Sequence, residues 1–188
     1  SLSCGKRGRT ERMFRVLELE KLSKEESREA VTIPVEKEGC PVKFNAHSID
    51  LIVNESGGYP YFIQFICREI YDLFLVQRAS GIEAVSVPMS EILAKLDTDF
   101  FSGRWTRATD RQKQLLSIIA DLDSSEREFT VQEVLEKMAS SMGKPMSASH
   151  VVQMLANLIS AGLIHKSRHG RYCFAVPLLG RFIKRQRV

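Results

Sequence analysis

The sequence predicts a mainly α fold, in which a small helical bundle is followed by a second unit of helices and one β-hairpin. Three observations lead to this prediction. Apolar residues recur at helical spacing through most of the 188 residues. Serine, threonine or asparagine precedes several of these segments, where its side chain can cap a helix. Near the end of the chain the apolar period becomes two, on both sides of a turn that contains glycine.

The first 22 residues precede the first predicted helix. Residues 1–12 are polar and basic and predict a flexible end. Residues 14–19 alternate apolar and polar side chains, as a strand does. A single strand has no partner for its backbone N–H and C=O groups. We therefore expect residues 14–19 to be the last strand of a sheet whose other strands lie in a longer protein.

Residues 23–103 are predicted to form the small helical bundle. Ser23 and Glu26 form a capping box, because each side chain can bond the backbone N–H of the other residue. They open a helix that ends near residue 35. Asn45 can cap a second helix, and a fourth helix is expected over residues 90–101. The inward side chains expected in the first helix are Ala30, Val31 and Ile33.

The stretch Gly57-Gly58-Tyr59-Pro60 joins the second helix to the long third one. Glycine takes the left-handed conformation that ends a helix, and proline suits the first helical turn. The third helix is expected to run from Pro60 to about Gln77. Such a turn can be a plain corner between helices, or it can lie against the ring or phosphate of a ligand. Residues 102–105 are then expected to break the helical period, which places a domain boundary after residue 103.

Residues 104–188 are predicted to form a winged helix-turn-helix domain. Thr109 caps a helix, residues 127–129 resemble a short strand, and Thr130 with Glu133 forms a second capping box. Ser147 caps a further helix that Gly162 ends. Two strands follow at residues 163–167 and 171–175, and a last helix covers residues 178–186. This order of helix, strand, helix, helix and hairpin is that of a winged helix. The inward positions expected in the helix after Ser147 are Val151, Val152, Leu155, Leu158 and Ile159.

The charges are distributed unevenly along the chain. Residues 1–136 carry 18 basic and 23 acidic side chains, whereas residues 137–188 carry nine basic side chains and no Asp or Glu. A basic segment of this kind favours an acidic partner, with nucleic acid first. The alternative is that the basic face packs against the more acidic N-terminal part of the same chain.

Duplex DNA is the partner that a winged helix favours. Its wing and last helix would contact phosphates, whereas its recognition helix exposes neutral polar side chains and no Arg or Lys. We therefore expect weak binding directed mainly at the DNA backbone. The alternative is a protein-interaction or autoinhibitory module. The predicted DNA-binding residues are Ser149, His150, Gln153 and Asn157 on the recognition helix, Lys166, Arg168, His169 and Arg171 on the wing, and Arg181, Lys184 and Arg185 on the last helix.

Residues 14–188 resemble the C-terminal part of an AAA+ or STAND-type P-loop ATPase. The strand-like residues 14–19 and the helix start at residues 22–26 look like the end of the ATPase core and the start of its helical lid. Gly58-Tyr59-Pro60 is similar to the Gly-x-Pro motif of that lid. The end of the winged helix, at residues 176–179, is similar to the domain that follows the lid in origin-recognition-type ATPases. The resemblance implies that Gly58, Tyr59 and Pro60 lie near the adenine and ribose of bound nucleotide.

The sequence departs from this family in its catalytic motifs. It has no Gly-x-x-x-x-Gly-Lys-Ser/Thr phosphate loop and no acidic pair after an apolar strand to hold magnesium. The first arginine after the glycine turn is Arg68, two helical turns in. We therefore expect no catalysis by this chain, and expect ATP or ADP with Mg²⁺ to bind a P-loop core that precedes it. A free-standing transcription regulator remains a third alternative.

Other sites are not favoured by the sequence. The four histidines and four cysteines are scattered without the spacing of a metal site. No apolar stretch is long enough to cross a bilayer, so we expect no membrane partner. The scattered cysteines and the absence of a signal-peptide pattern favour a cytoplasmic location.

Overall fold

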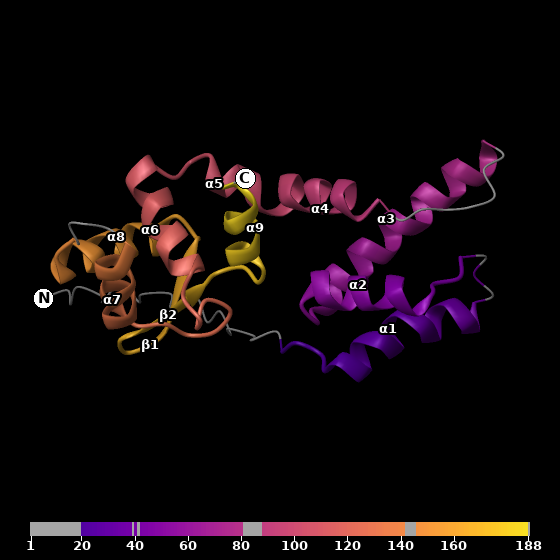
Figure 1. Cartoon of the computed structure of the whole chain (residues 1–188), viewed down its shortest axis with the longest axis horizontal. Helices are drawn as coiled ribbons and strands as arrows, with labels where there is room; N and C mark the ends of the chain where they lie inside the picture. Colours follow the sequence, from indigo (N-terminus) through magenta and orange to yellow (C-terminus); the bar gives the residue numbers. More distant parts are fainter. Residues whose placement is uncertain (1–19, 39, 41, 81–87, 142–145, 188) are drawn as a thin grey trace, which may run out of the picture.

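The computed structural model describes residues 20–38, 40, 42–80, 88–141 and 146–187 (Figure 1). It confirms the predicted fold class, which is mainly α with a two-stranded antiparallel hairpin near the C-terminus. The flexible end predicted over residues 1–12 and the strand predicted over residues 14–19 lie outside the described residues.

The described residues of the first unit contain the helices α1 (Lys24–Lys37), α2 (Ala46–Ser56), α3 (Pro60–Ala79) and α4 (Met89–Asp97). The predicted caps are present. Ser23 N donates to Glu26 Oε2 at 2.8 Å, Glu26 N donates to Ser23 Oγ at 3.2 Å, and Ser48 N donates to Asn45 Oδ1 at 2.7 Å. One cluster of buried hydrophobic side chains lies within this unit and consists of Val31, Val42, Ile52, Ile63, Ile66, Ile70 and Ile92.

Helix α1 buries a narrower face than its sequence predicts. Ser27 and Val31 are buried, because residues four apart lie on the same side of a helix. The prediction that Ala30 and Ile33 face inward is wrong, since both are exposed. Ile33 is about 200° around the helix from Val31, at about 100° per residue, so it cannot share the same contact.

The predicted helix break at residues 102–105 is also wrong. Helix α4 continues through a π-helical turn, η1 (Thr98–Ser102), into α5 (Gly103–Trp105). Gly103 has helical dihedral angles, φ −64° and ψ −27°. Glycine inside a helix costs only about 1 kcal/mol. Burial of Phe101, and the packing of the Trp105 ring on Phe182 with centroids 5.9 Å apart, offset this cost.

The second unit has the winged-helix order. It contains α6 (Asp110–Ala120), α7 (Val131–Ser141), α8 (Ala148–Ser160), β1 (Ile164–Arg168), β2 (Arg171–Phe174) and α9 (Leu179–Arg185). The hairpin pairs Ile164 with Phe174, and Gly170 takes a φ of +70° in its turn. Phe129 forms a bridge with Tyr172 at the position of the predicted short strand. The caps predicted at Thr109, Thr130 and Ser147 are all present.

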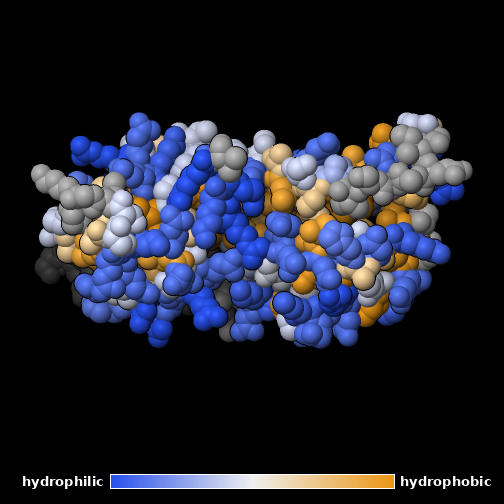
Figure 2. All heavy atoms as spheres, in the orientation of Figure 1, coloured by the Kyte–Doolittle hydropathy of each residue, from blue (hydrophilic) through white to orange (hydrophobic). Residues whose placement is uncertain are grey.

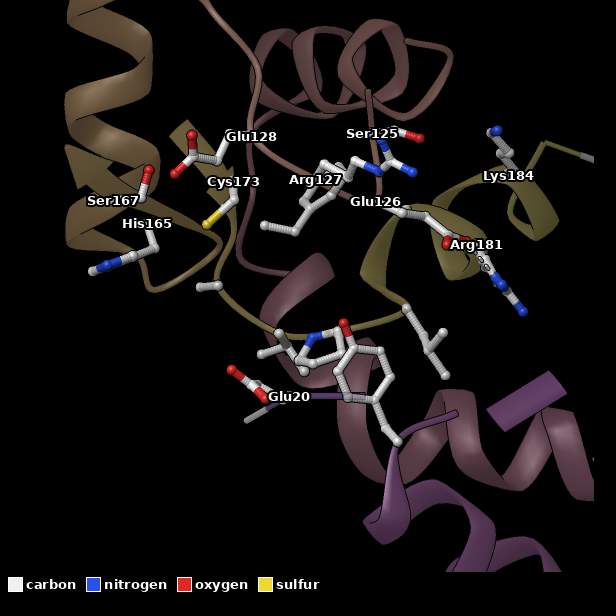
Figure 3. A pocket seen from close by; sticks show the side chains of 17 residues that line it. Glu20, Ser125, Glu126, Arg127, Glu128, His165, Ser167, Cys173, Arg181 and Lys184 are labelled. Atoms are coloured by element: carbon white, nitrogen blue, oxygen red, sulfur yellow. Dashed lines mark hydrogen bonds and ion pairs between the residues drawn. The ribbon is translucent and has the colours of Figure 1, made fainter. Parts of the chain in front are cut away.

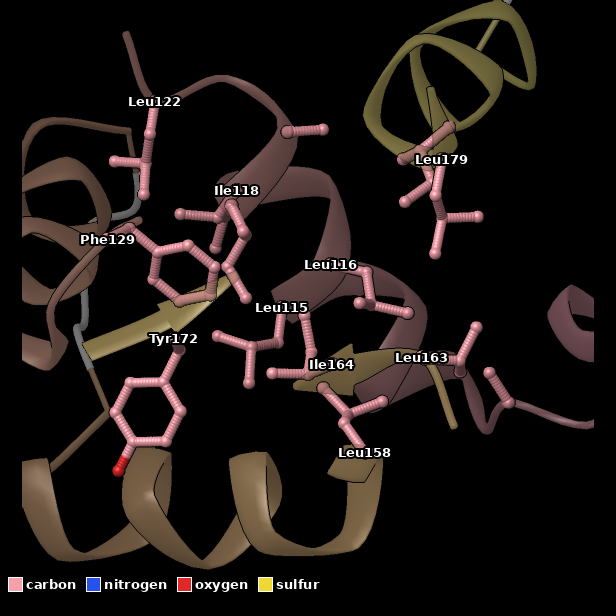
Figure 4. Close-up of a cluster of buried hydrophobic side chains, with 14 of the residues drawn as sticks. Leu115, Leu116, Ile118, Leu122, Phe129, Leu158, Leu163, Ile164, Tyr172 and Leu179 are labelled. Atoms are coloured by element: carbon pink, nitrogen blue, oxygen red, sulfur yellow. The ribbon is translucent and has the colours of Figure 1, made fainter. Parts of the chain in front are cut away.

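A second cluster of buried side chains fills this unit (Figure 4). In α8 it takes Val151, Met154, Leu155 and Leu158. The prediction that Val152 faces inward is wrong: this side chain is 46% exposed. The same cluster includes Phe62 of α3, Leu96 of α4 and Phe101 of η1. The first unit therefore packs directly against the winged helix through α3 and α4.

Candidate functional site

The glycine turn between α2 and α3 has the predicted backbone geometry. Gly57 is left-handed with φ +61° and ψ +18°, and Gly58 has φ +80°. Tyr59 is extended and Pro60 is the first residue of α3. Ser56 beneath the turn is fully buried, and its hydroxyl donates to the Val53 carbonyl and accepts from Gly58 N. The turn is thus held by hydrogen bonds from below.

Two distant segments cover this turn. The Leu22 N–H donates to the Gly58 carbonyl at 2.8 Å, and a Cβ on Gly58 would stand 2.6 Å from the Leu22 carbonyl oxygen. A Cβ on Gly57 would stand 2.8 Å from Leu178 Cδ2 of the winged helix. Leu178 has a φ of +64°, which costs a non-glycine residue about 1–2 kcal/mol. A Cβ at residue 58 would meet backbone, whereas a Cβ at residue 57 would meet the end of a side chain, so the approach at Gly58 is the stricter of the two.

Arginines of α9 connect the winged helix to the first unit. Arg181 Nε lies 2.7 Å from Glu126 Oε1, and its guanidinium also donates to the Asn54 carbonyl at the end of α2. The hydrogen bond from Arg181 lowers the pKa of Glu126. Arg185 donates two hydrogen bonds to the Asp97 carboxylate, one of them 2.9 Å long. The Arg185–Asp97 pair is largely shielded, since the side chains are 30% and 12% exposed.

Two further arginines of the carboxylate-free stretch are paired in the same way. Arg168 of the hairpin binds Glu128 at 2.7 and 3.0 Å, and its hydrogen bond lowers the pKa of Glu128. Arg187 binds Asp121 at 2.6 Å. All the carboxylates in these pairs precede residue 137. Much of the positive charge of residues 137–188 is therefore neutralised within the chain, as the alternative reading of the charge distribution expects.

A cavity of about 600 Å³ lies where the glycine turn meets the winged helix (Figure 3). Tyr59 and Glu20 line it on the side of the first unit, and burial raises the pKa of Tyr59. Figure 3 shows hairpin residues on one side, among them His165, and α9 residues on the other, among them Lys184. The volume falls within the usual range for small-molecule sites.

The predicted site residues fall on different surfaces. Tyr59, one of the predicted cofactor-binding residues, lines the cavity. Arg181 and Lys184, which are predicted to bind DNA, line the same cavity. Helix α9 lies between the two units, whereas α8 lies on the far side of the winged helix (Figure 1). The α8 side chains Ser149, His150, Gln153 and Asn157 are exposed there. On the hairpin Lys166 and His169 are exposed and Arg171 is half-buried.

Some functional candidates have no simple sequence signal. Asp97 and Glu126 bind arginines that follow them by 88 and 55 residues. A charged residue at the end of an apolar helix can indicate a buried ion pair, and Asp97, which follows Leu93 and Leu96, has this position. Within the described residues no three His, Cys, Asp or Glu side chains form a possible metal site. In the same part of the chain no helix has both the length and the apolarity to cross a membrane.

Comparison with known families gives a match that covers the winged-helix unit and the π-helical turn before it. Residues 98–183 are similar to a family described as a domain of unknown function, DUF8462. The match begins at η1 and ends in α9, so it includes the aromatic contact between Phe101 and Phe182. A search of curated proteins finds no match to the chain.

Proposed function

We propose that this chain is the lid and winged-helix part of a cytoplasmic AAA+ or STAND-type P-loop ATPase. The observation that carries the proposal is the turn at residues 57–60, with two left-handed glycines, an extended tyrosine and a proline that opens the next helix. Its location between helices that precede a winged helix is that of the lid motif. The core that precedes the lid would bind ATP or ADP with Mg²⁺.

In this proposal the turn contacts the nucleotide and the chemistry belongs to the core. Tyr59 lines the cavity and presents an aromatic ring suited to an adenine or ribose face. Gly58 and Pro60 would fix the position of Tyr59 rather than bind the nucleotide strongly. The sequence has no phosphate loop, so the chain alone is not proposed to be an enzyme.

The coding sequence upstream of Ser1 tests this proposal first, since it should encode a phosphate loop. In the longer protein, Tyr59→Ala should weaken ADP binding roughly tenfold, because base stacking contributes about 1–3 kcal/mol per base. Tyr59→Phe should bind as the unchanged protein does, and Tyr71→Ala on a distant exposed turn of α3 is the control. An upstream sequence without a phosphate loop, or unchanged ADP affinity in Tyr59→Ala, would refute the proposal.

For the winged helix, the geometry best supports a docking role on the lid. Helix α9 reaches the lid through Arg185 to Asp97, Arg181 to Asn54 and Leu178 to Gly57. A docked winged helix would hold the lid in one orientation over the nucleotide. Asp97→Ala should then accelerate nucleotide release from the longer protein. An unchanged release rate would contradict this docking role, and the contact between α9 and the lid would then serve only the stability of the fold.

Binding to the DNA backbone is the second candidate function of the winged helix. The observation that favours it is the surface formed by α8 and the hairpin. This face is not covered by the first unit, and α8 packs directly on β1. Neither Lys166 nor Arg171 has a carboxylate oxygen within 4.0 Å among the described residues. These two cations, with His169, are the wing residues best able to contact phosphates.

Salt titration of duplex DNA binding tests this candidate. The double variant Lys166→Ala/Arg171→Ala should lower the slope of log affinity against log salt by about 1.8, at about 0.9 per phosphate contact. Fluorescence anisotropy with labelled duplex measures this slope. An unchanged slope, or no binding at low salt, would exclude the wing as a DNA contact.

A further inference from the structure

Four cations lie within ten residues of sequence, where α5 is followed by α6. We call Arg104, Arg107, Arg111 and Lys113 the basic elbow. The Lys113 ammonium lies 5.6 Å from the centroid of the Trp105 ring, and Arg104 Nη1 donates to the Phe100 carbonyl at 3.1 Å. Trp105 itself packs on Phe182 of α9. Through Trp105 the basic elbow is therefore in contact with the core of the winged-helix unit.

The charges of the basic elbow are not compensated as those of α9 are. None of the four cations has a carboxylate oxygen within 4.0 Å in the part of the chain that the structure describes. The three arginines are exposed, and Lys113 is half-buried. Between residues 103 and 113 the sequence has a single carboxylate, Asp110. In the hairpin, in α9 and just after α9, by contrast, four arginines are each paired with a carboxylate.

We propose that the basic elbow binds the phosphate backbone of nucleic acid. The planar guanidinium of arginine donates two hydrogen bonds to a phosphate, and three of the four cations are arginines. Helix α6 begins at Asp110 between these cations, and its N-terminus adds positive potential. This proposal does not depend on the proposed ATPase function or on DNA binding by the hairpin. It depends only on the position and the unpaired charges of the basic elbow.

The surroundings of the basic elbow favour nucleic acid over a membrane or a protein. Membrane-binding surfaces insert apolar side chains, and protein interfaces have an apolar centre. Trp105 is the one large apolar side chain between residues 103 and 113. Its ring already packs against Phe182 and against the Lys113 ammonium. The exposed large hydrophobic side chains of the described residues lie elsewhere, on α1, α3 and α8.

The basic elbow and the wing are separate surfaces. In Figure 1 α5 and the start of α6 lie at the top of the second unit, and the hairpin lies at the bottom. Figure 2 shows strongly hydrophilic side chains over the region of α5 and the start of α6. Variants of the two surfaces therefore report on different contacts.

The test compares variants with matched charge in salt titrations of DNA binding. Arg104→Ala/Arg107→Ala/Arg111→Ala should lower the salt slope by about 2.7, at about 0.9 per phosphate contact. Lys24→Ala/Lys37→Ala/Arg78→Ala removes the same charge from exposed sites on the first unit and should leave the slope unchanged. Circular dichroism checks folding, and the single variant Arg107→Glu, at an exposed position, provides a second readout if the triple variant is unstable.

Each outcome decides the proposal. A reduced slope in the elbow variant alone supports it, whether or not Lys166→Ala/Arg171→Ala has an effect. Equal slopes in the elbow and control variants overturn it, as does the absence of DNA binding by the unchanged chain. Binding to anionic phosphatidylserine vesicles that the elbow variant abolishes, without DNA binding, would assign the basic elbow to a membrane instead.

Discussion

Replacing Gly58 by alanine is expected to destabilise the chain by about 3 kcal/mol, from the cost of a left-handed alanine plus a disrupted hydrogen bond. Gly58 has φ +80°, and the new Cβ would stand 2.6 Å from the Leu22 carbonyl oxygen. That oxygen belongs to the backbone, so it cannot move away by a side-chain rotation. Leu22 must shift instead, which disrupts its 2.8 Å hydrogen bond to the Gly58 carbonyl.

Gly162→Ala is the matched control. Gly162 has φ +68°, yet nothing lies within 4 Å of the position of its Cβ. It should therefore show only the conformational cost, about 1–2 kcal/mol. Gly57→Ala should fall between the two, because its close neighbour is the end of the Leu178 side chain, which can change rotamer, and not a backbone atom. Urea unfolding measures all three variants, and equal destabilisation at Gly58 and Gly162 would show that Leu22 does not restrict the turn.

Local features of this fold are predictable from the sequence because they depend on neighbouring residues. A capping box needs two side chains three residues apart, and both predicted boxes, Ser23 with Glu26 and Thr130 with Glu133, are present. The glycine turn is predictable for the same reason, since left-handed glycines and a first-turn proline are properties of four consecutive residues. The hairpin turn at Gly170 belongs to the same class.

The sequence predicts less well which apolar side chains are buried and where a helix ends, because both depend on tertiary packing. Periodicity indicates that a helix has an apolar side, but it does not give the width of the buried stripe. Ile33 and Val152 are apolar, yet they are 39% and 46% exposed because the neighbouring helices do not reach them. Gly103 stays helical because aromatic contacts around it favour continuation.

The site itself could be predicted only in part. Its turn is visible in the sequence, whereas the partners of its arginines are not, because ion pairs join residues far apart in the chain. The sequence groups Arg181 and Arg185 with the DNA-binding cations, and the structure places them at the contact with the first unit. Conversely, the sequence predicts a domain boundary at the basic elbow, and the structure shows that Arg104, Arg107 and Arg111 are exposed there.

Replacing Asp97 by alanine is expected to cost about 2–3 kcal/mol of folding free energy. This cost is below the range for breaking a fully buried ion pair, about 3–5 kcal/mol, because the pair is only partly buried. The substitution leaves the Arg185 guanidinium, 30% exposed, without its carboxylate at the contact between α4 and α9. At about 2–4 °C per kcal/mol for a chain of this size, the melting temperature should fall by roughly 4–12 °C.

A double-mutant cycle with Arg185→Ala separates the pair from its surroundings. The double variant should be more stable than the sum of the single costs, since removing both charges leaves neither one unpaired. Asp72→Ala is the control: its pair with Arg68 is 3.7 Å long, with side chains 55% and 80% exposed. Exposed pairs contribute about 0–1 kcal/mol, so this variant should change little. If Asp97→Ala were as mild as Asp72→Ala, the contact between α4 and α9 would be held by Phe101 and Phe182 rather than by the ion pair.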